Sequence, residues 1–327
     1  MTRPRLDRET VLTILAENDA LDDPSEVTVK PLGGGVSSIV LLVESPHWRY
    51  VFKQPRERFQ VTDDWQVPTE RARVEHDAAR FLDAHLPPYS VAPTLLYDAE
   101  REVVVFEAMP EGWVPWKERL LSGLVEPHLA HQAGRLMGRI HGLAERLGDD
   151  EMRHDDLFHA QRIDPYLRTT ARRVPQAARH LDELEKGFFA HAGLVHGDLN
   201  PKNLLTEGTR LILIDHEVMT RGDPAFDLAT LTNHLVLKAI HLPTHREALL
   251  DAAEEVRRGH ASVHPVDPAL LERADRWLGA LLLARVHGKS PVEYLSPQEK
   301  TIVTRLGLRI LDEGLGPGSV RRVVLEA

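Results

Sequence analysis

The stretch that decides the fold runs Leu194-Val195-His196-Gly197-Asp198-Leu199-Asn200-Pro201-Lys202-Asn203-Leu204-Leu205. A few residues later the chain reads Leu213-Ile214-Asp215-His216-Glu217. Apolar segments with strand character therefore bracket a polar loop, and a carboxylate follows the last of them. We expect strands at 204–205 and 211–214, which would hold the polar residues on short, fixed loops.

The polar residues of this stretch are the types that phosphoryl transfer from a nucleotide requires. That reaction needs one group that orients the attacking hydroxyl and oxygen ligands that hold magnesium against the phosphates. Asp198 heads the loop, the amide of Asn203 follows within the same loop, and Asp215 comes after the second strand. For Asp198 taken alone, an aspartate that only caps a loop is the alternative.

Three motifs occur in order in this part of the chain: HGDxxxxN at 196–203, Asp-His-Glu at 215–217 and GDPxxDLA at 222–229. The combination resembles the aminoglycoside phosphotransferase and choline kinase-like branch of the protein-kinase-like superfamily. This resemblance implies an α+β fold with two lobes, a small antiparallel β-rich N-lobe and a larger, mostly helical C-lobe. It also implies ATP and Mg²⁺ as cofactors and a hydroxyl of a small molecule as the acceptor.

The resemblance gives a role to each matching residue. Asp198 is implied to be the catalytic residue that accepts or orients the proton of the substrate hydroxyl. Asn203 and Asp215 are implied to bind magnesium, and His196 is implied to be a scaffold residue of the loop. Asp227 is implied to hydrogen-bond the backbone of the catalytic loop. An acid favoured by the dipole at a helix start explains Asp227 equally well.

The N-terminal half has the pattern of a sheet with one helix, and the C-terminal half has helical patterns. We expect strands at 27–32, 38–43, 49–53, 94–97 and 103–108, and a helix at 69–84. Further helices are expected at 127–147, within 164–190, and at 227–239, 246–258, 268–286 and 297–312. The predicted domains are a nucleotide-binding lobe at 1–108, a hinge at 109–115 and a helical catalytic and substrate lobe at 116–327.

Several N-terminal residues resemble the nucleotide site of the same superfamily. Glycines after the first strand would let backbone N–H groups approach the phosphates, although a glycine hairpin is the commoner explanation. The third strand carries Lys53, which the resemblance implies to be the phosphate-binding lysine; a solvated strand lysine is the alternative. Glu75 is its implied partner, with Glu70 and Asp77 as competitors and an exposed helix acid as the alternative. A segment resembling the adenine-binding hinge follows; an edge strand without ligand is its alternative. The implied nucleotide-binding residues are Gly33, Gly34, Gly35, Ser37, Lys53, Glu75, Phe106, Glu107, Ala108 and Met109.

Two features resemble 5-methylthioribose kinase. Glu217, two residues after the metal aspartate, matches the Asp-x-Glu of that enzyme and is implied to be a further metal ligand, with a surface acid as the alternative. Arg285 matches one of its two sugar-binding arginines, while Ala284 stands at the other position. The acceptor is therefore expected to be an aminoglycoside or amino sugar, a methylthioribose-like sugar or an amino alcohol. A cationic acceptor predicts acidic residues around it, and a sugar predicts a mixed site.

Two other readings of the motifs are a protein kinase and a catalytically inactive nucleotide-binding scaffold. The segment between Asp215 and Asp227 is too short for an activation loop that docks peptides. A scaffold is expected to have lost one of the four reactive positions, and Lys53, Asp198, Asn203 and Asp215 are all present. Transfer to a small molecule is the favoured prediction.

The amino-acid composition limits the kinds of partner that the chain is expected to bind. The 327 residues carry a net charge of −10, which argues against a general affinity for nucleic acid or an anionic membrane surface. The absence of cysteine excludes disulfides and a cysteine nucleophile. We see neither a secretory signal nor an apolar run of the roughly 20 residues that span a bilayer. A cytoplasmic monomer or homodimer is expected.

Overall fold

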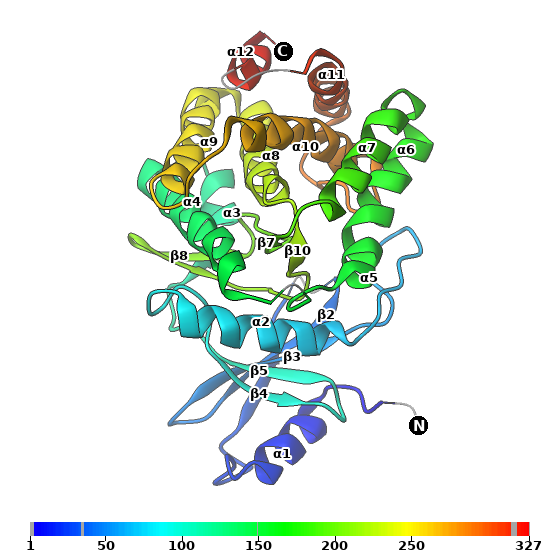
Figure 1. Cartoon of the computed structure of the whole chain (residues 1–327). Coiled ribbons are helices and arrows are strands. Elements are labelled where there is room, and N and C mark those ends of the chain that lie inside the picture. The colour runs from blue at the N-terminus through cyan, green and yellow to red at the C-terminus, as the bar shows by residue number, and fades with distance from the viewer. Residues whose placement is uncertain (1–2, 34–35, 149, 315–318, 327) are drawn as a thin grey trace. The chain divides into compact units, whose positions relative to one another are not determined.

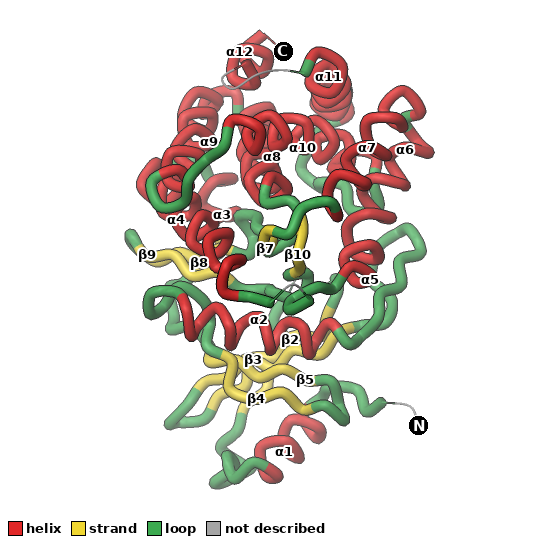
Figure 2. Tube along the Cα trace, viewed as in Figure 1, coloured by secondary structure: helices red, strands yellow, loops and turns green. Residues whose placement is uncertain are grey.

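The computed structural model describes residues 3–33, 36–148, 150–314 and 319–326. The chain divides into two compact units. The first comprises Met1–Glu111 with Asp215–Glu217, and the second comprises Gly112–Ile214 with Val218–Ala327. Figure 2 shows the strands of the large sheet in the first unit and mostly helix in the second.

The first unit is built on an antiparallel sheet of five strands in the order β1-β2-β3-β5-β4. Helix α1 packs on this sheet through apolar side chains, and α2 contacts strands β3, β4 and β5 (Figure 1). The bounds are α1 Arg8–Glu17, β1 Thr28–Pro31, β2 Ser38–Glu44, β3 Arg49–Pro55, α2 Arg71–His85, β4 Thr94–Asp98 and β5 Val103–Glu107.

The core of the first unit joins α1 to the sheet. Ile14 of α1 is buried with Val43, Phe52 and Val103 of the strands, so the helix and three strands share one apolar layer. The buried amide of Gln54 supplements it, because its Oε1 accepts from the N–H of Leu6 at 2.8 Å. The core thus fixes β3, the strand that carries the lysine implicated in nucleotide binding.

The second unit begins with a short strand and continues mainly as helices. Its first part contains β6 Val114–Pro115, α3 Trp116–Leu121, α4 Pro127–Gly142, η1 Leu143–Arg146, α5 Asp155–Phe158, η2 His159–Arg168, α6 Thr169–Arg173, η3 Pro175–Ala177 and α7 Ala178–Phe189. Its second part contains β7 Gly193–Val195, β8 Leu204–Glu207, β9 Arg210–Leu213, β10 Thr220–Gly222, α8 Ala225–His241, η4 Pro243–His245, α9 Arg246–Ala261, α10 Pro268–His287, α11 Pro297–Glu313 and α12 Ser319–Glu326.

Helix packing in the second unit is close where glycines remove side chains. Gly134 of α4 lies so near α9 that a Cβ there would come 2.0 Å from the carbonyl oxygen of Val256. Aromatic rings fill the layer between α7, α8 and α10, with Phe188, Phe226 and Trp277 packed edge to face. This core supports the start of α8, next to the loop 196–203.

The predicted α+β class, with an N-terminal antiparallel sheet and a largely helical C-terminal part, is confirmed. Two details differ from the sequence expectation. The helix expected at 127–147 ends at Gly142 and continues as a 3₁₀ turn. The segment 159–168 forms a π-helix that contains Pro165, because a proline without an N–H removes the regular helical hydrogen bond.

In the part of the chain that the structure describes, none of the helices is both long and apolar enough to cross a bilayer.

Candidate active site

The loop 196–203 is fixed by a buried carboxylate at the start of α8. Asp227, whose exposed fraction is 0%, accepts hydrogen bonds from the backbone N–H of His196 at 2.7 Å and of Gly197 at 2.9 Å. Gly197 has φ +77°, and a Cβ there would come 2.8 Å from the carbonyl oxygen of Val218. Only glycine suits this conformation and this close approach. The buried His196 ring in turn accepts from the N–H of Asp198 at 3.3 Å.

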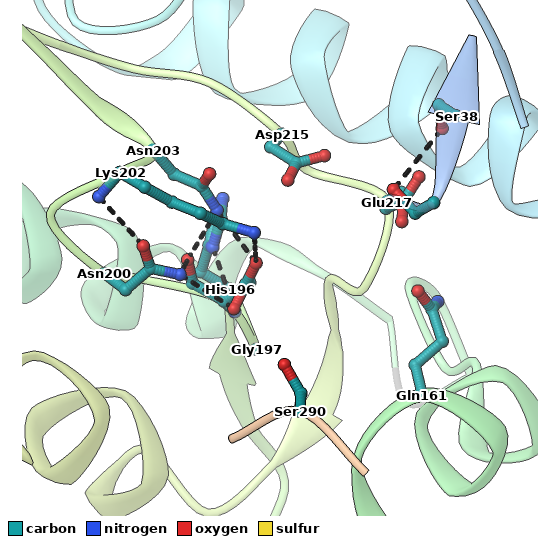
Figure 3. Close-up of polar contacts among 12 residues, drawn as sticks. Ser38, Gln161, His196, Gly197, Asn200, Lys202, Asn203, Asp215, Glu217 and Ser290 are labelled. Atoms are coloured by element: carbon teal, nitrogen blue, oxygen red, sulfur yellow. Dashed lines mark hydrogen bonds and ion pairs between the residues drawn. The ribbon is translucent and has the colours of Figure 1, made fainter. Parts of the chain in front are cut away.

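Asp198 is surrounded by donors. The Nδ2 of Asn200 donates to its Oδ1 at 2.9 Å, and the Nδ2 of Asn203 donates to its Oδ2 at 2.9 Å. Arg162 pairs with its Oδ1 at 3.0 Å, and Lys202 with its Oδ2 at 3.4 Å. Figure 3 shows Asn200, Lys202 and Asn203 together on the loop beside His196.

This environment keeps Asp198 ionised. Burial alone would raise the pKa of Asp198, but Arg162 first and Lys202 second hold that pKa well below its usual value. A carboxylate with a low pKa is a weak base but a good hydrogen-bond acceptor, so it can orient a hydroxyl and take its proton late in the reaction. The Nδ2 of Asn203 donates two hydrogen bonds to Asp198, so the Oδ1 of Asn203 is the side-chain atom that could bind a cation.

Sequence reasoning missed Arg162. This buried arginine lies on η2, its Nε donates to the carbonyl oxygen of Gly197 at 2.6 Å, and its guanidinium also stacks over the ring of Tyr166 at 5.4 Å. It therefore holds both the backbone and the carboxylate of the catalytic loop. No motif marks it, because it lies more than thirty residues upstream of the loop on a helix of irregular geometry.

The first unit contains a buried ion-pair cluster around Lys53 of β3. Its Nζ lies 2.9 Å from the Oε1 of Glu75 on α2, pairs closely with Asp215 and lies 3.5 Å from the Oε2 of Glu217. Burial would lower the pKa of Lys53, but Asp215 and Glu75 raise it well above its usual value. Burial raises the pKa of Glu75 to about 8, and Lys53 opposes that shift.

The competitors proposed for Glu75 lie elsewhere. Asp77 pairs with Arg73 at 3.6 Å on the solvent side of α2, and Glu70 precedes the first residue of that helix. The partner of Lys53 within α2 is therefore Glu75.

A second buried cation, Arg71, was also missed by sequence reasoning. Its Nε lies 3.4 Å from the Oε2 of Glu217, and one Nη2 donates to the carbonyl oxygens of Ser37 at 2.8 Å and Arg56 at 2.7 Å. Arg71 thus ties the end of the glycine loop to Glu217. In Figure 3 the hydroxyl of Ser38 also points toward the Glu217 carboxylate.

The carboxylates of this cluster suit a divalent cation. Oxygen atoms of Glu75, Asp215 and Glu217 lie within 4.8 Å of one another, so three carboxyl groups could face one ion. Magnesium prefers carboxylate oxygens of this kind. Asp215 also has φ +70°, a left-handed conformation that is uncommon outside glycine and recurs at functional sites.

The predicted phosphate-binding loop before β2 is described only in part. Gly34 and Gly35 lie outside the described residues. Gly33 is exposed with open space where a side chain would be, and the hydroxyl of Ser37 lies 3.5 Å from that of Ser38. At Gly33 no side chain covers the backbone of the loop before β2.

In the segment 106–109 much of the backbone is already paired. Phe106 is buried in β5, the N–H of Glu107 donates to the carbonyl of Pro93 at 2.9 Å, and that of Ala108 donates to the carbonyl of Arg49 at 3.0 Å. Within the described part of the chain, the N–H of Met109 has no backbone partner. It is therefore a candidate donor to a ligand in this segment.

Arg285 lies near the end of α10 in the second unit. Its Nη1 donates to the hydroxyl of Tyr166 at 3.2 Å and to the Oγ of Ser290 at 3.0 Å. The ring of Tyr166 is thus shared by Arg285 and by Arg162, which pairs with Asp198. Through these contacts Arg285 belongs to the surroundings of Asp198.

The sheet, the helical unit and these two charged clusters define a kinase-like phosphotransferase. Residues 28–266 match the "Phosphotransferase enzyme family", and because this match covers most of the chain, the protein belongs to that family. It is a small-molecule kinase, a class that moves a phosphoryl group from ATP to a hydroxyl. No curated protein sequence matches the chain.

Solved structures with the same fold are only distantly similar in sequence. Amicoumacin kinase hAmiN, solved with AMP-PNP, Ca²⁺ and Ami, is 16% identical with a TM-score of 0.64 over 97% of this chain and 100% of that chain. A choline/ethanolamine kinase family protein from Mesorhizobium loti is 15% identical, with a TM-score of 0.58 over 97% and 100%. Macrolide 2'-phosphotransferase MphH from Brachybacterium faecium is 19% identical, with a TM-score of 0.52 over 97% and 96%. The likeness confirms the predicted fold.

Proposed function

We propose that this kinase transfers the γ-phosphoryl group of ATP to a hydroxyl of a sugar-like small molecule, with Asp198 as the catalytic residue. The observation that carries the proposal is the hydrogen bonding of Asp198. Two amides and an arginine hold the carboxylate in one orientation, and the same neighbours keep it ionised at neutral pH. A fixed, ionised carboxylate can accept a hydrogen bond from the attacking hydroxyl and aim its oxygen at the phosphorus.

The first unit supplies the proposed nucleotide site. Lys53, fixed by Glu75, would donate to the phosphates, and the N–H of Met109 would donate to the base. Asp215 and Glu217, together with the Oδ1 of Asn203, would hold magnesium. When bound, that ion neutralises charge on the phosphates and fixes their orientation. Under this proposal residues 1–108 bind nucleotide, 109–115 form the hinge, and 116–327 bind the acceptor.

Substitution of Asp198 by Asn tests the proposal, since an amide keeps the shape but cannot accept the proton. We expect kcat to fall about 10²–10⁴-fold across a panel of amino sugars and ribosides while ATP binding persists. ADP release measures the first quantity, and calorimetry with AMP-PNP measures the second. A kcat close to that of the wild type would refute the role of Asp198. Magnesium-dependent ATP binding without transfer by the wild type to any acceptor would favour the scaffold reading.

A further inference from the structure

Lys238 of α8 is a buried cation that the proposed chemistry does not use. Its exposed fraction is 0%, and its Nζ makes one long hydrogen bond, 3.3 Å to the carbonyl oxygen of His234 one turn earlier. The ammonium lies 5.5 Å from the centre of the Tyr294 ring. Among the described residues, no carboxylate lies within ion-pair distance of it. A buried charge without a counterion is costly, and proteins keep such groups mainly at functional sites.

Arg285 is a second cation and is half-buried, unlike the fully buried Lys238. Its two hydrogen bonds go to the neutral hydroxyls of Tyr166 and Ser290, and its buried Nε has no hydrogen-bond partner in the described structure. No carboxylate of the described chain forms an ion pair with it either. We call Lys238 and Arg285 the cationic pair.

The two members of the cationic pair belong to one cluster. Helices α8 and α10, which carry them, pack against each other. Arg285 acts electrostatically on Lys238 and on Tyr294, the residue whose ring lies beside the Lys238 ammonium. The buried hydroxyl of Tyr294 also has no hydrogen-bond partner among the described residues. Three polar groups with unused donor capacity therefore gather in one place.

This cluster adjoins the catalytic carboxylate. Tyr166 stacks with Arg285 and also with Arg162, which pairs with Asp198 at 3.0 Å. His234 provides a second connection, because both Arg285 and Asp198 act electrostatically on its ring. Tyr166 and His234 thus connect the cationic pair to the surroundings of Asp198.

The acids near the cationic pair do not neutralise it. Asp164 pairs with Lys289 at 2.9 Å, and Glu293 pairs with Lys117. Each of these carboxylates already has a cation of its own, so the charge of the cationic pair remains in excess. An overall charge of −10 makes this local excess of positive charge unusual for the protein.

The pKa of Lys238 is consistent with the lack of a nearby counterion among the described residues. Burial, followed by Lys117 and Arg285, lowers the pKa of Lys238 to about 7, and Glu293 opposes the shift only weakly. An anion bound beside the ammonium would reverse that effect, since an opposite charge favours the charged form.

We infer that the acceptor of this kinase is an anionic hydroxyl compound, a hydroxy acid or acid sugar, whose carboxylate binds to Lys238 and Arg285. The inference rests on the proposed function, because it places the hydroxyl of the same molecule at Asp198. An ammonium and a guanidinium both donate strong hydrogen bonds to a carboxylate. The unpartnered hydroxyl of Tyr294 can donate a further one.

The same charges disfavour the cationic acceptors that the sequence left open. An aminoglycoside or an amino alcohol would bring an ammonium group toward two cations for which the described residues supply no carboxylate partner. Like charges in a desolvated site repel each other strongly, so the cationic pair selects against such molecules.

Two matched acceptor sets test the inference. They are glycerol, glycerate and 3-amino-1,2-propanediol, and glucose, glucuronate and glucosamine. Binding is measured by calorimetry with magnesium and AMP-PNP occupying the nucleotide site, and transfer is measured by ADP release from ATP. We expect the carboxylate of each set to bind at least about tenfold more tightly than the neutral member, and the amine to bind most weakly.

The variants are Lys238→Met and Arg285→Met, with Lys186→Met as the control because Lys186 is exposed on α7. We expect each of the first two to weaken carboxylate binding about 10–100-fold, to weaken binding of the neutral acceptor much less, and to preserve AMP-PNP binding. Arg285→Lys, which keeps the charge, should retain part of the preference. Preserved AMP-PNP binding shows that a variant is folded.

The outcomes separate the inference from the proposed function. Carboxylate binding that the variants lose, without transfer by the wild type, would support the inference and contradict the proposed function. Transfer to the neutral or amine acceptors in preference to the carboxylates would support the function and overturn the inference. Failure of every carboxylate to bind, or unchanged binding by the Lys238 and Arg285 variants, would overturn it as well.

Discussion

Replacing Lys238 by Met should stabilise this protein. Lys238 is buried and has no carboxylate partner among the residues that the structure describes, and burial is the main cause that lowers its pKa from 10.5 to about 7. Folding therefore works against the charged form of this side chain. Methionine has a similar length and volume and no charge, so the packing of α8 should survive the substitution.

The size of the effect follows from the shift of the pKa. At about 1.4 kcal/mol per unit, the drop from 10.5 to about 7 bounds the cost of burying the charge at about 5 kcal/mol. Because folding lowers the pKa of this lysine, the burial cost is complete below the pKa of the folded state and vanishes above the pKa of the unfolded state. We expect Lys238→Met to raise the free energy of unfolding by about 2–4 kcal/mol near pH 6.5 and by about half as much near pH 9.

Urea unfolding of the wild type and the variant at these two pH values measures the effect. Because every other titrating group is common to both proteins, the difference between them isolates Lys238. Lys186→Met, on the exposed face of α7, should change stability by less than about 0.5 kcal/mol. A variant less stable than the wild type, or a gain that does not shrink between pH 6.5 and 9, would refute the reasoning.

Three further outcomes are expected. Arg162→Met removes the strongest interaction that lowers the pKa of Asp198, so the acid limb of the plot of kcat against pH should move up by about 1–3 pH units. An acid limb at the same pH as in the wild type would contradict this role of Arg162. Asp227→Asn replaces a buried carboxylate that accepts two backbone hydrogen bonds, and it should cost about 2–3 kcal/mol in urea unfolding; an unchanged midpoint would show that the loop is held otherwise. Gly134→Ala places a Cβ 2.0 Å from a carbonyl oxygen and should lower the Tm. Gly187→Ala, which adds a Cβ in open space within α7, should instead raise the free energy of unfolding by about 0.5–1 kcal/mol. Equal effects of the two substitutions would contradict the close packing described for α4.

The local parts of this site could be predicted from sequence because they depend on short spacings. Asp198 and Asn203 lie five residues apart in one loop between two strands, so their side chains are close in space. The strand that carries Lys53 and the helix that carries Glu75 were predicted by pattern, and the resemblance paired the two residues. Their measured contact, 2.9 Å, follows from the packing of α2 against β3.

The long-range parts could not be predicted. Arg162 and Arg71 look like ordinary helix arginines in the sequence, yet one pairs with Asp198 and the other is fully buried beside Glu217. The π-helix at 159–168, which gives Arg162 its place, has no clear sequence pattern. Such roles depend on which segments pack together.

The sequence by itself determined the family, the fold class and the order of the reactive residues, since motif spacing and the periodicity of apolar residues are properties of a short stretch of chain. Only the tertiary structure decided where cations without a counterion lie. The whole molecule has a net charge of −10, yet Lys238 and Arg285 have no carboxylate partner within the described part of the chain. The physical reason is that electrostatic interactions act over a few ångströms of space, and the neighbours within that range are chosen by packing and burial.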